Sequence, residues 1–252
     1  MRGYIQILLF STLLISQQSF GSTIIVASDE WATSNVGFAN SPDVANFVLN
    51  ITNSFSGRGP GQFHAYSNNF SLTQSSLANT LTSAGHAWTT GTGITFDLLT
   101  LSSYDGIFLA LGADGYDANV LTDYVNSGGN VYIAGGTSSN TAGTAGFWNP
   151  FLNQFGLGFE SSLIPGGGYN EVITSSHQIF NNVGSLYQAG GQGVLDLDLV
   201  NPLNLVLEYN QSGANGMYAI YETSAIPVPA AFWLFGTALL GLVGFSKRRK
   251  VT

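Results

Sequence analysis

Short apolar runs alternate with polar, glycine-rich stretches along the chain and predict alternating strands and helices. Residues 23–27 are apolar and mostly β-branched, which indicates a strand buried on both faces. Apolar side chains recur at helical spacing over residues 44–55, directly behind Ser41, Pro42 and Asp43. Because serine is a favoured N-cap, proline fits the first helical position and an acid stabilises the first turn, we expect a helix to begin there.

A second helical pattern covers residues 73–84 and ends at Gly85. Farther along, Asn149 and Pro150 are expected to open another helix that runs to Phe155 and is closed by Gly156.

The clearest unit is a strand, helix and strand in the middle of the chain. An apolar strand pattern over residues 104–112 is followed by Asp117 as an N-cap and by a helical pattern over residues 118–126. Two glycines then precede a second apolar strand at residues 131–134. Two apolar strands joined by a short helix should lie parallel in one sheet.

The pattern changes to strands alone toward the C-terminal end of the body. Strands are predicted over residues 194–199, 203–209 and 217–222, the last two joined by a hairpin loop at 212–216. The whole pattern predicts an α/β domain: an open, mostly parallel sheet with helices on both faces and antiparallel strands toward the C-terminal end.

Both ends of the chain have the character of targeting segments. Residues 1–21 begin with one positive charge, continue with an apolar stretch and end in small residues, which is typical of a cleaved signal peptide. Residues 230–246 form an apolar run without ionisable side chains, which at about 1.5 Å per residue falls slightly short of a bilayer core of about 30 Å. We therefore expect a transmembrane segment there.

A basic cluster follows this run, in a tail of residues 247–252 that is expected to stay in the cytoplasm. It consists of Lys247, Arg248, Arg249 and Lys250. Positive charges next to a membrane segment stay on the cytoplasmic side, so the body, residues 22–222, should be exported. Residues 223–229 are then a linker, and the body is expected to be a single domain.

Charge is distributed very unevenly in the exported body. Arg58 is its one lysine or arginine, whereas all fourteen acids of the chain lie within it, giving a net charge of −13. Such a domain repels the phosphate backbone, so nucleic-acid binding is excluded. The chain has no cysteine, which excludes disulfides, thiolate metal sites and cysteine nucleophiles.

The C-terminal segment resembles the PEP-CTERM sorting signal of Gram-negative envelope proteins. The resemblance is carried by Pro227, Val228 and Pro229, the apolar Trp-Leu-Phe-Gly core behind them, and the basic tail. Val228 stands where the family most often has Glu. The resemblance implies export, processing by signal peptidase and an exosortase-like enzyme, and delivery to the cell surface or an extracellular polysaccharide matrix.

The body resembles the class I glutamine amidotransferase-like superfamily, particularly its ThuA-like branch, which implies a flavodoxin-like or amidotransferase-like sheet. The strand, helix and strand unit carries this resemblance, together with the segment His177-Gln178-Ile179, similar to the branch's His-Pro-Ile. In amidotransferases a cysteine nucleophile follows the second strand of the unit, where this chain has Gly135, Gly136, Thr137 and Ser138. Thioester chemistry is therefore excluded.

A hydroxyl nucleophile would need a base within hydrogen-bond reach, and His177 is the histidine that could approach from a following loop. The more ordinary interpretation is that Gly135 and Gly136 form a tight strand exit and that His177 is a packed side chain.

A candidate ligand pocket can be placed at the carboxyl edge of the sheet, where open parallel sheets bind ligands. Asp29, Glu30 and Trp31 follow the first strand, and Asp114 follows the strand at 104–112. The candidate pocket residues are Asp29, Glu30, Trp31, Asp114, Gly135, Gly136, Thr137 and His177. The acids would bind polar groups and Trp31 would stack on a sugar ring; the alternative is ordinary solvated loops.

No catalytic residue, resident cofactor or metal is assigned, although calcium suits a body rich in carboxylates. Asp114 with Asp117, and Asp196 with Asp198, are the acid pairs that could contribute. Against this, Asp117 is already explained as an N-cap, and an Asp-x-Asp pair is usually a solvated strand face.

Three functions remain open from the sequence. The first is a non-catalytic binding or structural protein in a polysaccharide-rich envelope. The second is a carbohydrate-active hydrolase that uses the strand-end carboxylates. The third is a periplasmic ligand sensor held in the inner membrane by an uncleaved tail.

Overall fold

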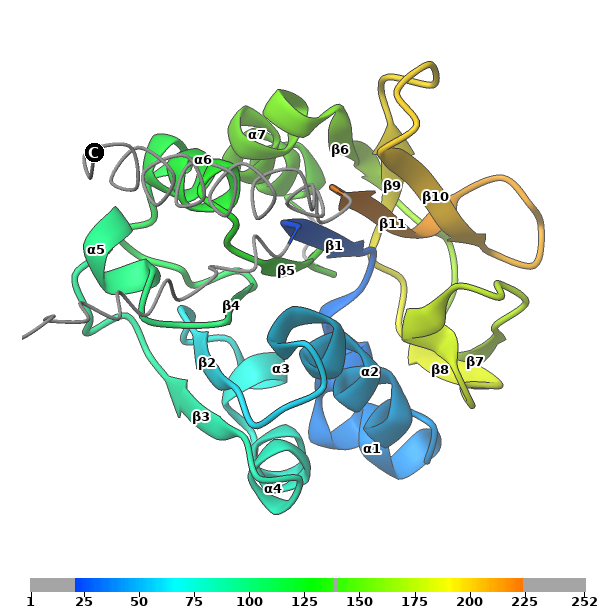
Figure 1. The fold of residues 1–252 in the computed structure, drawn as a ribbon. Helices are drawn as coiled ribbons and strands as arrows, with labels where there is room; N and C mark the ends of the chain where they lie inside the picture. Colours follow the sequence, from blue (N-terminus) through cyan, green and yellow to red (C-terminus); the bar gives the residue numbers. More distant parts are fainter. Residues whose placement is uncertain (1–20, 138–139, 224–252) are drawn as a thin grey trace, which may run out of the picture. The chain divides into compact units, whose positions relative to one another are not determined.

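A nine-stranded sheet runs through the computed structural model, which describes residues 21–137 and 140–223 (Figure 1). The strand order is β3-β2-β4-β5-β1-β11-β9-β6, with β10 paired to β11 beside this path. β7 and β8 form a separate two-stranded ribbon. The strands are β1 (Thr23–Ala27), β2 (Gln62–Ala65), β3 (Ala87–Thr90), β4 (Gly106–Leu109), β5 (Val131–Ala134), β6 (Leu157–Leu163), β7 (Tyr169–Val172), β8 (Ser185–Gln188), β9 (Gln192–Asp196), β10 (Asn204–Tyr209) and β11 (Gly216–Glu222).

Helices cover both faces of this sheet, so the predicted α/β class is confirmed. Figure 1 shows α1, α2 and α3 on one side of the strands and α6 and α7 on the other. The α-helices are α1 (Asn35–Asn40), α2 (Val44–Ser56), α3 (Phe70–Thr73), α4 (Ser75–Ser83), α5 (Leu98–Leu101), α6 (Ala118–Asn126) and α7 (Thr141–Leu152). Short 3-10 helices are η1 (Glu30–Thr33), η2 (Asn153–Phe155) and η3 (Gln178–Phe180).

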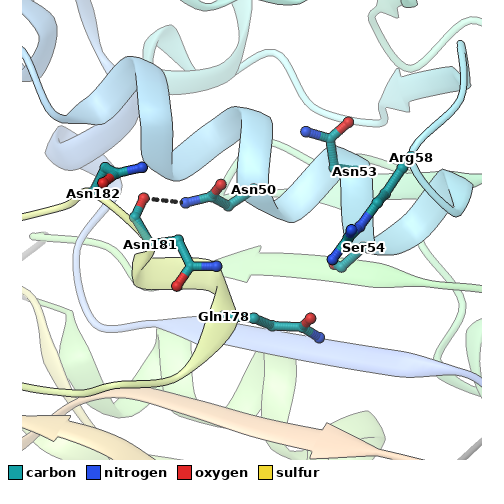
Figure 2. A pocket seen from close by; sticks show the side chains of 7 residues that line it. All are labelled: Asn50, Asn53, Ser54, Arg58, Gln178, Asn181 and Asn182. Carbon is teal, nitrogen blue, oxygen red and sulfur yellow. Dashed lines mark hydrogen bonds between the residues drawn. The ribbon is translucent and has the colours of Figure 1, made fainter.

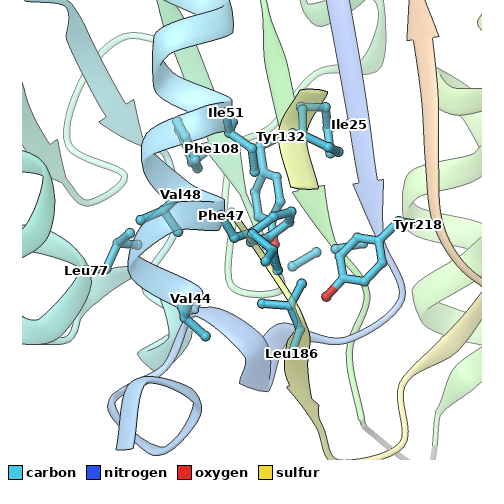
Figure 3. Close-up of a cluster of buried hydrophobic side chains, with 14 of the residues drawn as sticks. Ile25, Val44, Phe47, Val48, Ile51, Leu77, Phe108, Tyr132, Leu186 and Tyr218 are labelled. Carbon is cyan, nitrogen blue, oxygen red and sulfur yellow. The ribbon is translucent and has the colours of Figure 1, made fainter. Parts of the chain in front are cut away.

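Alternating side chains of the buried strands divide the core into two layers. In β1, Ile25 and Ala27 join the cluster beneath α2 and α4, whereas Ile24 and Val26 join the cluster beneath α6 and α7. Successive side chains of a strand point to opposite faces, so a strand covered by helices on both faces must be apolar throughout. Figure 3 shows the α2 layer, in which Phe47 contacts Tyr218 edge-on at a centroid distance of 5.3 Å.

The parallel half of the sheet contains the predicted strand, helix and strand unit. β4 and β5 are adjacent and parallel, with Ile107 opposite Val131. The connecting α6 begins where the sequence predicts, because the Asp117 carboxylate accepts hydrogen bonds from the backbone N–H groups of Asn119 and Val120, at 2.8 and 3.3 Å.

The position of β1 could not be foreseen from the pattern. β1 is parallel to β5 on one side and antiparallel to β11 on the other, with Thr23 opposite Glu222 and Ala27 opposite Tyr218. In the flavodoxin-like order 2-1-3-4-5, the first strand of the chain lies between the second and the third. Here the first strand, β1, lies instead between β5 and β11. β11, the last strand of the body, fills a central position.

One predicted helix is capped differently and another starts elsewhere; α2 itself begins at Val44, as the sequence predicts. The Ser41 hydroxyl donates to the Ser185 carbonyl and the Asp43 carboxylate accepts from the N–H of Ser185, so these side chains bind β8 rather than capping α2. The helix predicted from Asn149 begins eight residues earlier, at the start of α7, and contains Pro150. Pro150 lies near the C-terminal end of α7, which ends at Leu152.

Strands near the C-terminal end were predicted only in part. β10 and β11 match their predicted ranges closely, whereas β9 covers Gln192–Asp196 and so begins two residues before, and ends three residues before, the predicted strand at 194–199. β2, β3, β6, β7 and β8 were not predicted. β2 and β3 are only four residues long, and the exposed pattern of β3 carries little strand periodicity.

The predicted targeting segments fall outside the described residues. These are residues 1–20 of the predicted signal peptide 1–21, most of the predicted linker, the apolar run at 230–246 and the basic tail. Within the described part of the chain, no helix is both long and apolar enough to cross a bilayer.

Backbone from three segments surrounds the carboxyl end of β1: the Ser28 N–H donates to the Met217 carbonyl at 2.8 Å, and two further segments donate to residues 27–28. The N–H of Gly135 donates to the Ala27 carbonyl, and the N–H of Gln192 donates to the Ser28 carbonyl, both at 2.8 Å. A β-carbon at Gly135 would lie 2.5 Å from the Ser28 carbonyl oxygen and 2.9 Å from the Phe159 ring. Only glycine allows β5 to leave the sheet this close to β1.

We expect Gly135→Ala to lower the free energy of unfolding by about 1–3 kcal/mol, because the added methyl group must displace backbone. Gly146→Ala is the matched control, because Gly146 lies within α7 and a β-carbon added there would meet no atom within 4 Å. It should leave stability unchanged or raise it by up to about 1 kcal/mol. Urea denaturation measures both variants, and equal effects would contradict this account of Gly135.

Candidate functional site

The carboxyl ends of β1 and β5 form the topological switch point of the sheet. These adjacent parallel strands continue over opposite faces, β1 toward α2 and β5 toward α7. Open α/β sheets bind ligands at such points. The structure thus brings Asp29, Glu30 and Trp31 together with Gly135, Gly136 and Thr137, as the sequence predicts.

Asp29 is buried beneath the turn that joins β8 and β9. Its side chain is 0 % exposed, and its carboxylate accepts hydrogen bonds from the N–H groups of Trp31, at 2.8 Å, and Ala189. Burial raises the pKa of Asp29 to about 6; the two N–H donors oppose this shift and the nearby Glu30 charge adds to it. Asp29 therefore fastens the 188–191 turn over the switch point.

Glu30 connects the loops that follow β2 and β5. One carboxylate oxygen accepts from the Asn69 amide at 2.6 Å, and the other accepts from the Thr137 hydroxyl at 3.2 Å and N–H at 3.4 Å. The Trp31 indole N–H donates to the same hydroxyl at 3.1 Å. We call Asp29, Glu30, Trp31, Asn69 and Thr137 the switch-point cluster.

Trp31 is only partly available for stacking. Its ring packs against Phe70 at a centroid distance of 4.7 Å and an angle of 57°, and it is half-buried. The indole therefore already has an aromatic neighbour and a hydrogen-bond acceptor, and its first role is to hold η1 against α3.

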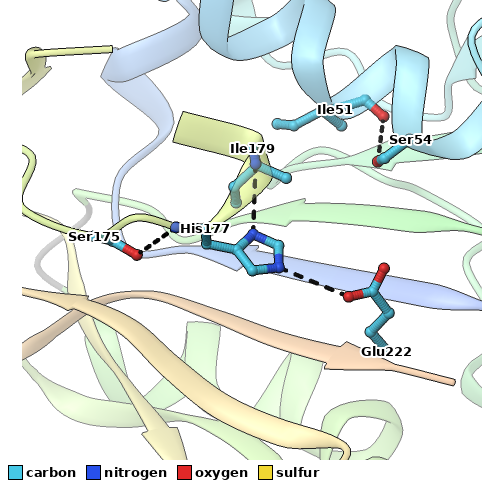
Figure 4. A network of polar contacts seen from close by, with 6 residues as sticks. All are labelled: Ile51, Ser54, Ser175, His177, Ile179 and Glu222. Atoms are coloured by element: carbon cyan, nitrogen blue, oxygen red, sulfur yellow. Dashed lines mark hydrogen bonds and ion pairs between the residues drawn. The ribbon is translucent and has the colours of Figure 1, made fainter. Parts of the chain in front are cut away.

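The other two candidate pocket residues lie apart from this cluster. Asp114 is exposed in the loop after β4, where its carbonyl accepts from the Tyr66 hydroxyl at 2.8 Å. His177 forms an ion-pair contact of 3.7 Å with Glu222, which lies opposite Thr23 at the start of β1 (Figure 4). This is the amino end of the strand, about 13 Å from its carboxyl end at 3.3 Å per residue. The placement of His177 in the pocket was therefore wrong.

None of the three histidines can serve Thr137 as a base in the described structure. His64 is hydrogen-bonded to Thr89 at 2.7 Å and to the Gly91 carbonyl at 2.9 Å, and burial lowers its pKa. His86 accepts from the Gly61 N–H at 3.1 Å, and burial likewise lowers its pKa. Ser138, the other candidate hydroxyl, lies outside the described residues.

The acid pairs considered for calcium are engaged in turns. Asp196 ends β9, and its carboxylate accepts from the Asp198 N–H at 3.0 Å, so the two acids do not share a strand face. Asp117 caps α6. Among the described residues, no group of three or more acidic, histidine or cysteine side chains is arranged to hold a metal.

A polar groove between α2 and η3 is the site that sequence reasoning missed. Its volume is about 430 Å³, and seven side chains line it (Figure 2). They are Asn50, Asn53, Ser54, Arg58, Gln178, Asn181 and Asn182, which we call the Arg58 groove. In the sequence, Arg58 is the sole cation of the body and His177 begins a recognisable motif, but nothing in the sequence indicates that the two segments meet.

Hydrogen bonds from α2 hold the two walls of the Arg58 groove together. The Asn50 amide donates to the carbonyls of Asn181, at 2.8 Å, and Ile179, at 3.2 Å. The Asn46 amide donates to the Asn182 carbonyl at 2.9 Å. On the opposite wall, His177 caps η3 through its Nδ1, which accepts from the Ile179 N–H at 3.4 Å (Figure 4).

A second hollow of about 360 Å³ lies between β7 and β10. The Glu208 carboxylate there accepts from the N–H groups of Thr174 and Ser175, at 2.7 and 2.8 Å. Burial raises the pKa of the neighbouring Glu171, which the Tyr169 hydroxyl and Gln211 N–H oppose and the Glu208 charge reinforces. Because the Glu208 carboxylate already binds the backbone of residues 174–175, its role in this hollow is structural.

Comparison of the chain with family models, curated proteins and solved structures finds no match. The described structure is an α/β domain in which protein groups occupy the topological switch point and a polar groove lies beside α2.

We expect stability to fall as pH rises from about 4 to above 6, because Asp29 keeps its proton in the folded state over a range where the unfolded chain has lost it. The folded pKa lies above the unfolded value, so this contribution is complete at acid pH and disappears as pH rises through the folded pKa. A shift of about 2 pKa units corresponds to about 3 kcal/mol.

Asp29→Asn should flatten this part of the curve of unfolding free energy against pH. Asp123→Asn, which removes an exposed carboxylate from α6, is the matched control and should keep the decline. If the decline persists in Asp29→Asn, the assignment to Asp29 is wrong.

Arg58 and Asn182 are the non-glycine residues with positive φ in the described structure, at 70° and 59°. We expect Arg58→Gly to raise the free energy of unfolding by about 0.5–1 kcal/mol, since glycine has no β-carbon to strain in this conformation. Arg58→Ala retains the β-carbon and should show no such gain. Urea titration compares the two variants, and an equal change in both would show that the backbone is unstrained.

Proposed function

We propose that this chain is an exported envelope protein, sorted by its C-terminal segment, whose α/β domain has a non-catalytic binding or structural role among extracellular polysaccharide. The observation that carries this proposal is the pairing of an apolar run and four cations at the C-terminal end with a body that has one cation and fourteen acids. Four adjacent cations would retain the tail at the cytoplasmic side during export. The body would then be released outside.

The geometry of the switch-point cluster supports binding or structure over catalysis. A glycosidase needs two free carboxyl groups at a separation of roughly 5–10 Å. Asp29 and Glu30, by contrast, are 0 % and 6 % exposed and accept hydrogen bonds from the loops around them. Carboxylates committed in this way cannot easily approach a sugar, so the hydrolase alternative loses its leading residues.

The arrangement of the body's ends supports attachment by one edge. The Ser22 N–H donates to the Thr223 hydroxyl at 2.7 Å, and the Thr223 N–H donates to the Ser22 carbonyl at 2.9 Å. Both residues lie at the amino end of β1, opposite the switch point. A linker leaving from Thr223 would hold the domain by this edge while sorting takes place.

The proposal predicts two processing events that mass spectrometry of cell fractions can detect. In the surface or secreted fraction of a bacterium with a sorting enzyme, the mature chain should begin at Ser22 and lack residues 230–252. The double variant Pro227→Ala, Pro229→Ala should keep its tail and accumulate in the inner membrane, whereas the exposed loop variant Pro165→Ala should be processed normally.

Full-length chain in the cytosol, with both ends intact, would overturn the proposal. A wild-type chain that loses its signal peptide but keeps its tail in the inner membrane would replace it with the membrane-held sensor.

A further inference from the structure

We infer that the Arg58 groove binds a carboxylate-bearing saccharide, with Arg58 holding the carboxylate and the surrounding amides holding hydroxyl groups. The inference rests on the proposed function for the source of the ligand, and it names the ligand class and the site. It is independent of the switch-point cluster.

The charge of the groove is the first argument. Arg58 is the only lysine or arginine in a body with fourteen acids, yet within the described residues its side chain makes no ion pair or hydrogen bond. The Arg58 side chain runs back along α2 toward Ser54, into the groove (Figure 2). An unpaired guanidinium has five donors in a planar fork that matches a carboxylate.

Backbone conformation is the second argument. Both non-glycine residues with positive φ, Arg58 and Asn182, lie on opposite walls of this one groove. Asparagine adopts left-handed backbone readily, whereas arginine does so at a cost, so Arg58 is the strained residue of the two; strained backbone is frequent at binding sites. At Arg58 this conformation follows directly on Gly57, the left-handed residue that ends α2. The left-handed conformation of Arg58 thus belongs to a residue whose side chain lines the groove.

The uncharged lining is the third argument. Within the described structure, the side-chain amides of Asn53, Gln178, Asn181 and Asn182 have no protein hydrogen-bond partner. Each amide offers both donors and an acceptor, which suits hydroxyl groups that also donate and accept. The volume of about 430 Å³ lies within the range of about 300–1,000 Å³ that small-molecule sites have.

The same features argue against other anions. None of the side chains that line the groove is aromatic, so a nucleotide base would have no stacking surface. Arg58 lies just beyond the carboxyl end of α2, where the backbone carbonyl groups repel concentrated negative charge such as phosphate. A carboxylate carries one negative charge and is therefore repelled less than a phosphate group, which carries about −1.5 to −2.

Titration calorimetry of the mature domain against three saccharides with one carboxylate each tests the inference: the methyl glycosides of glucuronate and of galacturonate, and a disaccharide of one glucuronate and one glucose. At least one should bind, and its carboxyl-reduced form, which keeps the hydroxyl groups, should bind at least tenfold more weakly. Loss of a charge-assisted hydrogen bond predicts that Arg58→Gln weakens binding about 10- to 100-fold. Arg58→Gly should weaken it equally while the domain remains folded, which separates binding from stability.

Asn53→Ala should weaken binding about fivefold, since one hydrogen bond is lost. Asn79→Ala is the matched control, because Asn79 is a helical, exposed asparagine on α4 outside the groove. No binding by any of the three acidic saccharides, equal binding of the carboxyl-reduced forms, or unchanged affinity in Arg58→Gln would each overturn the inference. These results do not depend on where the chain is processed, so the proposed function stands or fails separately.

Discussion

The pairing of β1 with β5 on one side and β11 on the other is the constraint on which the rest of the structure depends. Every residue of β1 is buried, and its two faces contribute to both core layers. Parallel pairing with β5 ties it to the strand, helix and strand unit, while antiparallel pairing with β11 brings the last strand of the body beside the first. The first and the last strand of the domain therefore lie side by side in the middle of the sheet.

This arrangement also decides which surfaces remain free to bind a ligand. With β11 and β9 beyond β1, the turn before β9 lies over the carboxyl end of β1 and takes up the Asp29 carboxylate. In an open sheet this edge would receive a ligand. Here protein backbone occupies it, and the groove rich in unpaired polar groups lies instead beside α2, on the covering layer of helices.

The charges of the chain are distributed unevenly between its C-terminal end and the body. Cations are concentrated at residues 247–250, which we propose to flank a membrane segment, and are almost absent from the body. In a field of fourteen acids the one remaining arginine stands out as a local attraction for an anionic group. We expect a domain of this kind to repel nucleic acids and anionic lipid, whereas the proposed site would retain a saccharide whose single carboxylate reaches Arg58.

The sequence by itself determined the α/β class and the helix α6 with its Asp117 cap. It also determined that Asp29, Glu30 and Thr137 lie close together at the carboxyl edge of the sheet. Hydrophobic periodicity, helix caps and strand ends are local signals, so they can be read from the sequence. The tertiary structure decided what these residues do. The helix behind Ser41 and Asp43 begins where the sequence predicts, but their side chains bind β8 instead of capping it. His177 lies at the amino end of β1 and not at the predicted carboxyl end, because strand order depends on contacts between residues distant in the chain. The meeting of Arg58 with residues 178–182 was decided in the same way: it requires α2 and η3 to pack, and long-range packing leaves no periodic trace in the sequence.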